Sequence, residues 1–234
     1  MATLSIVATP IGNLEDITLR ALKALASADI VLCEDTRMTK RLLDKHGISK
    51  STLSYHMHSK LSKVEQIIAL LKEGKKLALV SDAGTPGISD PGAELVMRVR
   101  KELAAELDSG VLKIEVLPGP SALTAALSIA GVPCADFIFL GFLPHKKGRE
   151  TLFKEIALAE RTMVFYESPH RIEKTLESLS KHLIDTTKRV TVCRELTKIF
   201  EEVVAGTAEE VAAYFTAHPD KVRGEFVVIV SDAL

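Results

Sequence analysis

The chain has 234 residues, which is enough for one large domain or two small ones. Its hydrophobic content of 47% and charged content of 26% are those of an ordinary globular protein. It contains no apolar run of about 18 residues, so a membrane-spanning helix is not expected. A formal net charge of −1 excludes a strongly basic nucleic-acid-binding protein, and any RNA contact must come from local patches.

The cysteines and the first residues indicate a cytoplasmic protein. Cys33, Cys134 and Cys193 are far apart and form no CxxC pair, which is typical of reduced thiols. They lie in or beside apolar runs, so we expect them to pack as small hydrophobic side chains. The opening segment MATLSIVATPIGN lacks the basic region of a signal peptide and predicts a first strand instead.

In the first half of the chain, short apolar runs alternate with amphipathic helical segments. Gly47 and Gly74 follow two of the helices and are suited to ending them. The segment 52–58 predicts a short edge strand or a loop. The other strands are expected at 4–9, 28–33, 77–80 and 111–117, and the helices at 17–25, 37–46, 60–73 and 92–107.

The second half repeats this alternation after the turn Pro118–Gly119–Pro120. Ser121 opens an alanine-rich helix, Ser168 and Pro169 predict an N-cap and first helical residue, and Thr207 predicts another cap. The remaining strands are expected at 137–140, 162–166, 189–193, 203–204 and 225–230, and the helices at 147–159, 169–182 and 207–215. This pattern predicts two α/β domains, 1–117 and 118–234, with mainly parallel sheets covered on both faces.

The stretch Leu79–Gly92, LVSDAGTPGISDPG, is the most distinctive of the chain. An apolar strand leads into a loop rich in glycine and proline, and Asp90 before Pro91 predicts the cap of the next helix. Gly84 and Gly87 would let the backbone approach a ligand closely. Ligands of open α/β sheets bind at such strand ends. The alternative is a long connection without a ligand, although such connections are usually only about 2–6 residues long.

Several familiar motifs are absent. The glycine loop has no GK[ST] and is not a Walker A motif, no GxGxxG follows the first strand, and no GxSxG occurs. His56 and His58 could ligate a metal, but no third ligand lies at a suitable spacing, so surface histidines are the better interpretation. We therefore expect no metal site.

Charged clusters follow three further predicted strands. Each cluster alone could be no more than caps and a solvated edge. Parallel strands present their carboxyl ends at the same edge of a sheet, so together the clusters could line one cleft that grips a phosphodiester and holds a hydroxyl near a base. The clusters are Glu34, Asp35, Thr36 and Arg37; Tyr166, Glu167, Ser168, Pro169, His170 and Arg171; and Arg194, Glu195, Leu196, Thr197 and Lys198.

Two basic patches are candidates for RNA contact, although charge runs are often only solvated helix faces. One patch is short and consists of Lys146, Lys147 and Arg149. The other, the first in the chain, spans 37–63, where Asp44 is the only acid. Its basic residues, with Tyr55, His56 and His58 interleaved, are Arg37, Lys40, Arg41, Lys45, Lys50, Lys60 and Lys63.

The sequence also resembles a known family. The segments that carry the resemblance are ATPIGNLEDITLRAL, CEDTRMTKRLL, VSDAGTPGISDPG, LPGPSALTAAL, FLGFLP, FYESPHRI, VCRELTK and RGEFVVIV, and they run from Leu4 to Val230. In this order they are similar to the bacterial 16S ribosomal RNA cytidine-2′-O-methyltransferases of the tetrapyrrole methylase-like superfamily, the class III methyltransferases.

The resemblance implies a fold, a cofactor and partners. It implies two α/β domains with S-adenosylmethionine bound in the cleft between them, and a cytoplasmic homodimer without a DNA or membrane partner. The implied activity is methylation of a cytidine 2′-OH in the decoding region of 16S rRNA within the small ribosomal subunit. The residues it places at the cofactor are Pro10, Asp82, Ala83, Gly84, Ser89, Ser121, Ala122, Tyr166 and Glu167.

Methyl transfer from a sulfonium is an in-line displacement that depends on positioning, and a ribose hydroxyl benefits from a nearby base or cation. Our hypothesis is that this environment is provided by Glu34, Asp35, Arg37, Arg194, Glu195 and Lys198, with His170 as a further candidate base. Two alternatives stay open. The first is a methylase of a tetrapyrrole or another small substrate, and the second is a non-catalytic RNA- or ribosome-binding factor.

Overall fold

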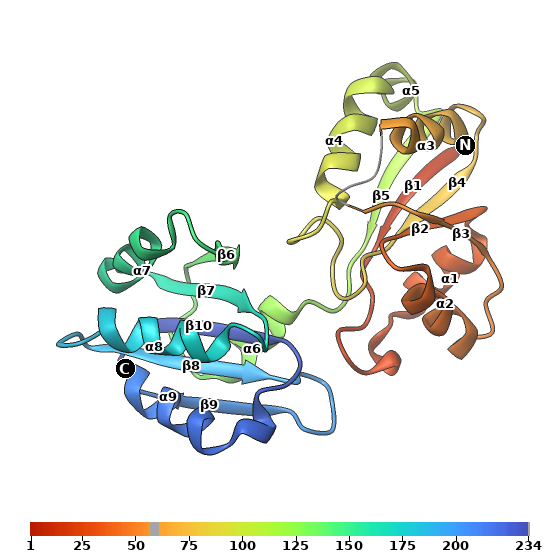
Figure 1. Ribbon diagram of the computed structural model, residues 1–234. Coiled ribbons are helices and arrows are strands. Elements are labelled where there is room, and N and C mark those ends of the chain that lie inside the picture. The colour runs from red at the N-terminus through yellow and green to blue at the C-terminus, as the bar shows by residue number, and fades with distance from the viewer. Residues whose placement is uncertain (57–60, 234) are drawn as a thin grey trace. The chain divides into compact units, whose positions relative to one another are not determined.

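The computed structural model describes residues 1–56 and 61–233. The chain folds into two compact units, Met1–Ser121 (unit 1) and Ala122–Leu234 (unit 2), which are labelled by element in Figure 1. The division between Ser121 and Ala122 follows the Pro118–Gly119–Pro120 turn. The boundary expected from the sequence, after Leu117, lies just before this turn.

Unit 1 is built around a five-stranded sheet in the order β3-β2-β4-β1-β5, and all its strand pairs are parallel. β3 lies at one edge of the sheet, as the sequence predicts. The strands are β1 (Ala2–Val7), β2 (Ile30–Cys33), β3 (Ser51–Ser54), β4 (Lys76–Leu79) and β5 (Leu112–Leu117). The helices are α1 (Leu19–Ser27), α2 (Thr36–Lys45), α3 (Leu61–Lys72), α4 (Gly92–Glu102) and α5 (Ala104–Asp108), with a short 3₁₀ turn, η1 (Leu14–Asp16).

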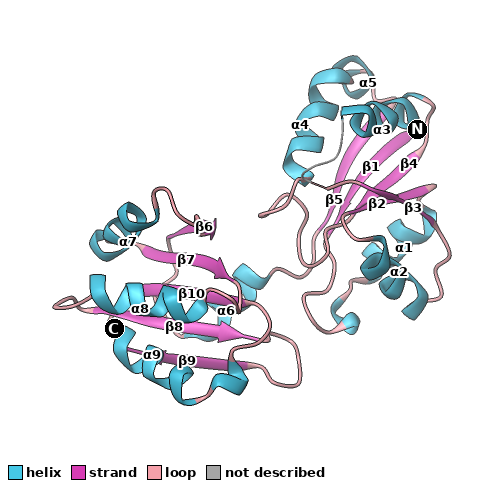
Figure 2. Cartoon of the chain, in the orientation of Figure 1, coloured by secondary structure: helices cyan, strands magenta, loops and turns pink. Residues whose placement is uncertain are grey.

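Helices cover both faces of this sheet. One apolar cluster joins the sheet to α1 and α2 through residues such as Ala21, Leu25 and Leu42. A second joins the opposite face to α3 and α4 through residues such as Ile67 and Leu95. Figure 2 shows the two helical layers of unit 1 on either side of its strands. The strands are apolar on both faces because both faces are buried, which explains their continuous hydrophobic runs.

Unit 2 has a mixed sheet in the order β6-β7-β10-β8-β9. Only β6 and β7 pair in parallel, and β10 is antiparallel to both of its neighbours, as β9 is to β8. The expectation of a mainly parallel second sheet was therefore wrong. The strands are β6 (Phe137–Phe142), β7 (Thr162–Glu167), β8 (Lys188–Arg194), β9 (Glu202–Gly206) and β10 (Phe226–Asp232).

Connection length explains this difference. The link from β8 to β9 covers only residues 195–201, and a parallel crossover needs about a dozen residues or more, so β9 must turn back beside β8. β10 then inserts between β7 and β8 in the opposite direction. β6, β7 and β8 still run the same way, so the segments that follow them share one edge of the sheet. The reasoning that placed charged clusters at a common edge therefore holds within unit 2.

Three helices of unit 2 pack on one face of its sheet around Phe153, Leu179 and Phe215. α6 packs on the other face against β8 and β10. The helices are α6 (Ala122–Ala130), α7 (Arg149–Leu158), α8 (Ile172–His182) and α9 (Ala208–Ala217), followed by the 3₁₀ turn η2 (Pro219–Lys221). None of the helices in 1–56 and 61–233 is long and apolar enough to cross a membrane.

Two predicted helix caps need correction. α4 begins at Gly92, as predicted, but its cap residue is Pro91, one position after the predicted cap Asp90, although the Asp90 carboxylate does accept from the Gly92 N–H at 2.7 Å. α8 begins only at Ile172, so Ser168 is not its N-cap. A turn intervenes because the N–H groups of Arg171 and Ile172 both donate to the Ser168 carbonyl. Thr207 caps α9 as predicted, in a full capping box with Glu210.

Cys33 and Cys193 are buried, as expected of thiols packed as small hydrophobic side chains, whereas Cys134 is exposed. Burial raises the pKa of Cys33, and it raises the pKa of Cys193 to about 12. Both buried thiols therefore stay protonated at neutral pH and are poor nucleophiles.

Candidate functional site

The carboxyl edge of the first sheet contains a topological switch point. β1 and β4 are neighbours, but the chain leaves β1 toward α1 on one face and leaves β4 toward α4 on the other. Loops that diverge in this way open a crevice, which is where ligands bind in open α/β sheets. The loop after β1 carries Pro10 and the loop after β4 carries Asp82–Ser89, so these cofactor candidates lie where the fold itself predicts a ligand.

A backbone bridge joins these two loops. The Thr9 N–H donates to the Gly84 carbonyl at 2.8 Å, and the Gly84 N–H donates back to the Thr9 carbonyl at 3.0 Å. The Thr9 hydroxyl also donates to the Ser81 carbonyl at 3.1 Å. Gly84 has a φ of +81°, a conformation that suits glycine and is costly for other residues. The bridge therefore depends on glycine at this position.

The second half of the glycine loop is organised by Asp90. Its carboxylate accepts from the Gly87 N–H at 2.7 Å and from the Gly92 N–H at 2.7 Å. A Cβ on Gly92 would lie 2.8 Å from the Asp90 carboxylate and 2.9 Å from the Gly87 nitrogen, which leaves no room for a side chain. Ser89 has a φ of +67°, unusual for a residue with a side chain, so this part of the loop is held in a strained conformation.

The turn after β5 joins the same assembly. The Thr85 hydroxyl donates to the Pro120 carbonyl at 3.1 Å. Gly119 lies so close to the first loop that a Cβ there would be 3.1 Å from the Ala8 Cβ. The loops after β1, β4 and β5 are thus connected directly, and Ser121 follows the last of them. Unit 1 therefore presents a preformed set of backbone groups along this edge.

Carboxylates gather at the ends of β2 and β4. The Asp82 carboxylate accepts from the Asp35 N–H at 2.9 Å. Burial, with a further contribution from the negative charges of Asp82 and Asp90, raises the pKa of Glu34. A carboxyl group whose pKa is raised by neighbouring carboxylates lies in a negative field. This part of the edge is suited to a cationic ligand rather than to a phosphate.

Asp35 and Arg37 form a separate, exposed pair. The Arg37 guanidinium donates to both Asp35 oxygens, at 2.6 Å for the shortest contact, and its backbone N–H donates at 2.8 Å. These hydrogen bonds lower the pKa of Asp35 to about 2. The Arg37 side chain is 89% exposed, so Asp35 both caps α2 and holds a cation at the surface. The structure thus brings Glu34, Asp35 and Arg37 together at one strand end.

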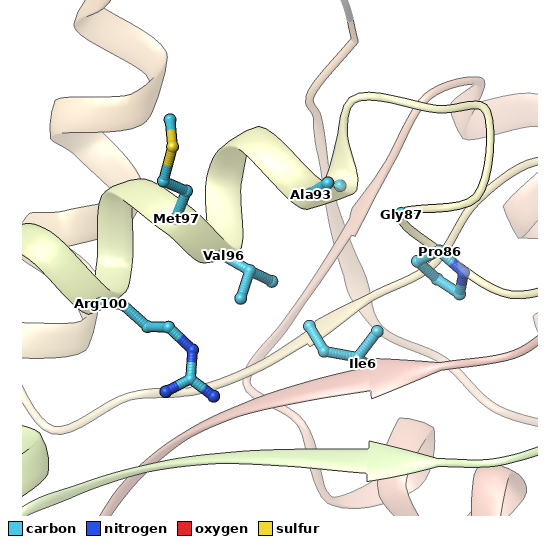
Figure 3. A pocket seen from close by; sticks show the side chains of 8 residues that line it. Ile6, Pro86, Gly87, Ala93, Val96, Met97 and Arg100 are labelled. Atoms are coloured by element: carbon cyan, nitrogen blue, oxygen red, sulfur yellow. The ribbon is translucent and has the colours of Figure 1, made fainter.

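A pocket of about 470 Å³ lies between α4 and β1 (Figure 3). Arg100 is its only charged lining residue. Its lining residues are Ile6, Pro86, Gly87, Gly92, Ala93, Val96, Met97 and Arg100. None of the residues that the sequence places at the cofactor is among them. The pocket is therefore an apolar hollow behind the glycine loop, separate from the acidic strand ends.

In unit 2, Glu167 ends β7 and is completely buried. Its carboxylate accepts from the Thr175 hydroxyl at 2.7 Å and the Ser168 N–H at 2.8 Å, and it forms an ion pair with Arg171 at 3.1 Å. Arg149 from α7 lies 3.7 Å away and donates to Thr175 at 2.7 Å. The Glu167 side chain is therefore fully occupied within unit 2, which leaves its backbone as the part able to contact a ligand.

The two arginines beside Glu167 hold the loop that follows β6. Arg171 donates to the Leu143 carbonyl at 2.6 Å, and Arg149 donates to the Pro144 carbonyl at 3.1 Å. Arg149, predicted to contact RNA, instead has a side chain only 14% exposed, while Lys146 and Lys147 beside it are exposed. Tyr166 packs edge-on against Phe139 and Phe142, with ring centroids at 4.9 and 5.5 Å.

The end of β8 carries the third cluster. Arg194 is buried, and its guanidinium donates to the Phe200 carbonyl and the Glu202 carboxylate, each at 3.3 Å. The Arg194 Nε is the only buried side-chain nitrogen or oxygen of the described residues without a hydrogen-bond partner. Strand register places three of these residues in one row across the sheet. Phe226 of β10 pairs with Glu167 on one side and with Arg194 on the other, and Arg194 in turn pairs with Glu202.

Glu195 and Lys198 form an ion pair of 2.8 Å in the loop that follows. Glu195 has a φ of +50°, and a Cβ on Gly224 would collide with its carboxylate at 1.7 Å. Glycine at position 224 therefore makes room for the Glu195 side chain. His170 is exposed on the same edge, after β7. Unit 2 thus brings His170, Arg194, Glu195 and Lys198 to one edge of its sheet.

No group of three or more potential ligands is arranged for a metal ion within residues 1–56 and 61–233. His58, one half of the weak histidine pair, lies outside the described residues, as does Lys60 of the first basic patch.

Comparisons with known proteins bear on this assembly. Residues 3–212 match the model of the tetrapyrrole (corrin/porphyrin) methylases. The chain is 44% identical over 231 residues to "Ribosomal RNA small subunit methyltransferase I" of Thermotoga maritima, covering 99% of each chain. A protein of the same name from Bacillus subtilis is 43% identical, over 98% of this chain and 75% of that protein. The chain belongs to the ribosomal RNA small subunit methyltransferase I family, within the tetrapyrrole methylases.

Solved structures agree on the fold. The chain aligns with the methyltransferase CobJ at a TM-score of 0.70 and 20% identity, over 99% of this chain and 94% of that one. It aligns with a uroporphyrin-III-C-methyltransferase from Thermus thermophilus at a TM-score of 0.64 and 20% identity, over 97% of this chain and 93% of that one. The tetrapyrrole methylase-like fold expected from the sequence is confirmed, and so is membership of a family of methyltransferases.

Sequence reasoning missed several residues that shape both edges. Thr175 and Glu202 were not predicted because Thr175 reaches Glu167 only when α8 packs beside β7, and Glu202 reaches Arg194 only when β9 pairs with β8. A glycine directly before a predicted strand, as at Gly224, could have been noted as a turn residue. The side chain it makes room for, Glu195, lies 29 positions earlier and could not be predicted from this pattern. Asp90 was singled out only as a helix cap, and its second role in holding Gly87 was not foreseen.

Proposed function

We propose that this chain transfers a methyl group from S-adenosylmethionine to the ribose 2′-OH of a cytidine in the decoding region of 16S rRNA. The observation that carries the proposal is the identity of 42–46% over nearly the whole chain to proteins named ribosomal RNA small subunit methyltransferase I. We extend the proposal to the assembled small subunit as substrate, a homodimeric enzyme and a cytoplasmic location.

The carboxyl edge of unit 1 fits the proposed cofactor. S-adenosylmethionine carries a sulfonium and an ammonium group. The negative charges of Asp82 and Asp90, which add to the effect of burial in raising the pKa of Glu34, favour such cations. Backbone groups of the glycine loop are the natural partners of its other polar atoms. When bound, the cofactor supplies an electrophilic methyl group. The residues proposed to hold it are Pro10, Asp82, Ala83, Gly84, Ser89 and Ser121, with Ala122, Tyr166 and Glu167 from unit 2.

The edge of unit 2 supplies groups suited to the hydroxyl. Glu195, held beside Lys198 at 2.8 Å, offers a carboxylate that can accept a proton and a cation that can stabilise an alkoxide. His170 is a second proton acceptor. Arg194 is buried and bonded to Phe200 and Glu202, so we assign it to holding the loop rather than to contact with the hydroxyl. Glu34, Asp35 and Arg37 remain candidates for orienting the reactants from unit 1.

Cofactor binding is the first test. Titration of S-adenosylmethionine and S-adenosylhomocysteine by calorimetry should give saturable binding that Gly84→Val weakens at least tenfold, because Gly84 has a positive φ and joins two loops. Gly110→Val is the matched control. Gly110 also has a positive φ, +73°, but nothing lies within 4 Å of an added Cβ, so binding should stay normal. Absence of binding to the folded wild-type protein would contradict the proposal.

Methyl transfer is the second test. Purified small subunits lacking the modification should accept one methyl group, and the modified ribose should resist alkaline cleavage because its 2′-OH is blocked. Glu195→Gln should slow the reaction at least a hundredfold with cofactor affinity unchanged. A near-normal rate would remove Glu195 from the mechanism. Transfer to a tetrapyrrole but not to subunits would replace the proposed substrate.

A further inference from the structure

Two large apolar side chains stand out from the edge of unit 2. Ile199 is 90% exposed and Phe200 is 71% exposed, and they are neighbours in the loop 195–201 that links β8 to β9. A phenylalanine this exposed is unusual, because burying its apolar ring would be favourable. These side chains directly follow Lys198 in the sequence, and Lys198 pairs with Glu195 of the proposed reaction site.

The loop is held firmly despite its exposure. Arg194 donates to the Phe200 carbonyl at 3.3 Å, and the Glu201 carboxylate accepts from the Thr197 N–H at 2.6 Å. Two turn hydrogen bonds, from Lys198 to the Glu195 carbonyl at 3.0 Å and from Glu201 to the Lys198 carbonyl at 3.1 Å, close its bends. The loop therefore presents Phe200 in a fixed place and loses little entropy when it binds a partner.

The surroundings of this loop are polar and partly cationic. Lys198 is exposed within it, and Arg223 is exposed just before β10, which starts at the same edge. Lys146 and Lys147 are exposed after β6, again at this edge. Two exposed acids, Glu201 and Glu225, lie among them, and Glu201 is engaged with the Thr197 N–H. A small exposed apolar pair with one aromatic ring, set among cations, is suited to a base and its phosphates rather than to an extended apolar protein surface.

We propose that Phe200 is a stacking platform for an unpaired base of the RNA substrate, with Ile199 beside it and the exposed Arg223 at the same edge available to the phosphate backbone. This inference rests on the proposed function. A ribose at a reaction site must leave the regular helix, and bases freed in this way stack on aromatic side chains. Phe200 lies next to the residues proposed to act on the 2′-OH, so the stacked base belongs to the methylated nucleotide or its neighbour.

The absence of tryptophan from the chain allows a direct test. Phe200→Trp introduces a single tryptophan, whose fluorescence should be quenched when a single-stranded RNA oligonucleotide of the decoding-region sequence is added at low salt. Leu158→Trp is the control. Leu158 is 83% exposed but ends α7, at the opposite edge of the same sheet, and its fluorescence should not respond. Equal quenching of both variants, or none of Phe200→Trp, would overturn the proposal.

Kinetics then separate stacking from simple apolar contact. Phe200→Ala should raise KM for the small subunit about 5- to 150-fold, the effect of losing one stacked base, with S-adenosylmethionine affinity unchanged. Phe200→Tyr should restore the wild-type KM, whereas Phe200→Leu should not, because leucine is apolar but has no ring. Rescue by leucine, or a concentration-dependent shift in sedimentation caused by Phe200→Ala, would point to a second copy of the chain and overturn the proposal.

These outcomes are distinguishable from failure of the proposed function. If the wild-type protein methylates small subunits and Phe200→Ala does so with unchanged KM, only the stacking role of Phe200 is wrong. If the wild-type protein neither binds S-adenosylmethionine nor methylates subunits, while Phe200→Trp is still quenched by RNA, the proposed reaction is wrong and RNA contact at this loop stands.

Discussion

The two units hold their functional edges with different chemistry. In unit 1, the loops after β1, β4 and β5 are joined by backbone and hydroxyl hydrogen bonds and by glycines that permit close approach. In unit 2, ion pairs centred on the buried side chains of Glu167 and Arg194 connect the segments: Glu167 pairs with Arg149 and Arg171, and Arg194 pairs with Glu202. An edge held by backbone hydrogen bonds leaves its side chains free to contact a ligand. An edge held by ion pairs fixes its loops, but the charged side chains then bind one another instead of a ligand.

The largest effect should come from the centre of the charged edge. Among the described residues, Glu167 is the only carboxylate paired with these two arginines, and Glu167→Gln removes its charge. Leaving a buried partner without its counterion typically costs about 3–5 kcal/mol. Hydrogen exchange should show lower protection across unit 2 and unchanged protection in unit 1. The control is Glu177→Gln, which breaks the exposed ion pair with Lys181 and should leave exchange unchanged.

A smaller loss of stability is expected at the edge of unit 1, which backbone hydrogen bonds hold together. Gly92→Ala places a Cβ 2.8 Å from the Asp90 carboxylate and should force open the turn that Asp90 holds. We expect a loss of about 1–3 kcal/mol, confined to unit 1, and a weaker affinity for S-adenosylmethionine measured by calorimetry. Full affinity in the variant would show that the cofactor does not depend on the geometry of this turn.

Each unit has a helix capped by a threonine hydroxyl, so removing these caps tests whether the same change costs both units the same stability. The Thr18 hydroxyl accepts from the Ala21 N–H at 3.1 Å in unit 1, and the Thr207 hydroxyl accepts from the Glu210 N–H at 3.2 Å in unit 2. Thr18→Ala and Thr207→Ala should each cost about 1 kcal/mol of the unfolding free energy of the unit that carries them. Clearly unequal losses would mean that the units differ in more than their edges.

The smallest effect concerns pH. Because the folded pKa of Glu34 is raised above its unfolded value, its ionisation opposes folding, so stability is lost as pH rises from 4.5 through the folded pKa. Glu34→Gln should match the wild type below pH 4.5 and be more stable near neutrality.

The pKa of Asp35 is lowered to about 2, so the effect of pH has the opposite sign. Asp35 contributes stability above pH 3.8, and this contribution is lost as pH falls toward 2. Urea unfolding across this pH range measures both.

The sequence predicted local structure well because caps, breakers and apolar periodicity act over a few residues. Thr207 and Gly47 are placed as expected, and so is the edge strand β3. Strand direction in unit 2 was missed because alternation of strands and helices was given more weight than the short link between β8 and β9.

The candidate site was predicted in outline rather than in detail. Charged residues after strands do meet at common edges, but their roles depend on partners far along the chain. Arg149 was expected to contact RNA, yet it lies against Glu167, and Arg194 lies against Glu202. Composition alone cannot distinguish a charge that faces a ligand from one that is neutralised inside the fold. That distinction requires the register of the strands and the reach of each side chain.

The position of β10 has a consequence for how the protein is made. All strands of unit 1 have been synthesised once the chain reaches Leu117, so its sheet can close while the rest is still being translated. In unit 2, β10 lies between β7 and β8, although it is the last strand of that sheet in sequence. Until residues 226–232 emerge, β7 and β8 each expose an unpaired edge, which is where strands of different molecules associate. Unit 2 is therefore the half of a nascent chain most in need of a chaperone.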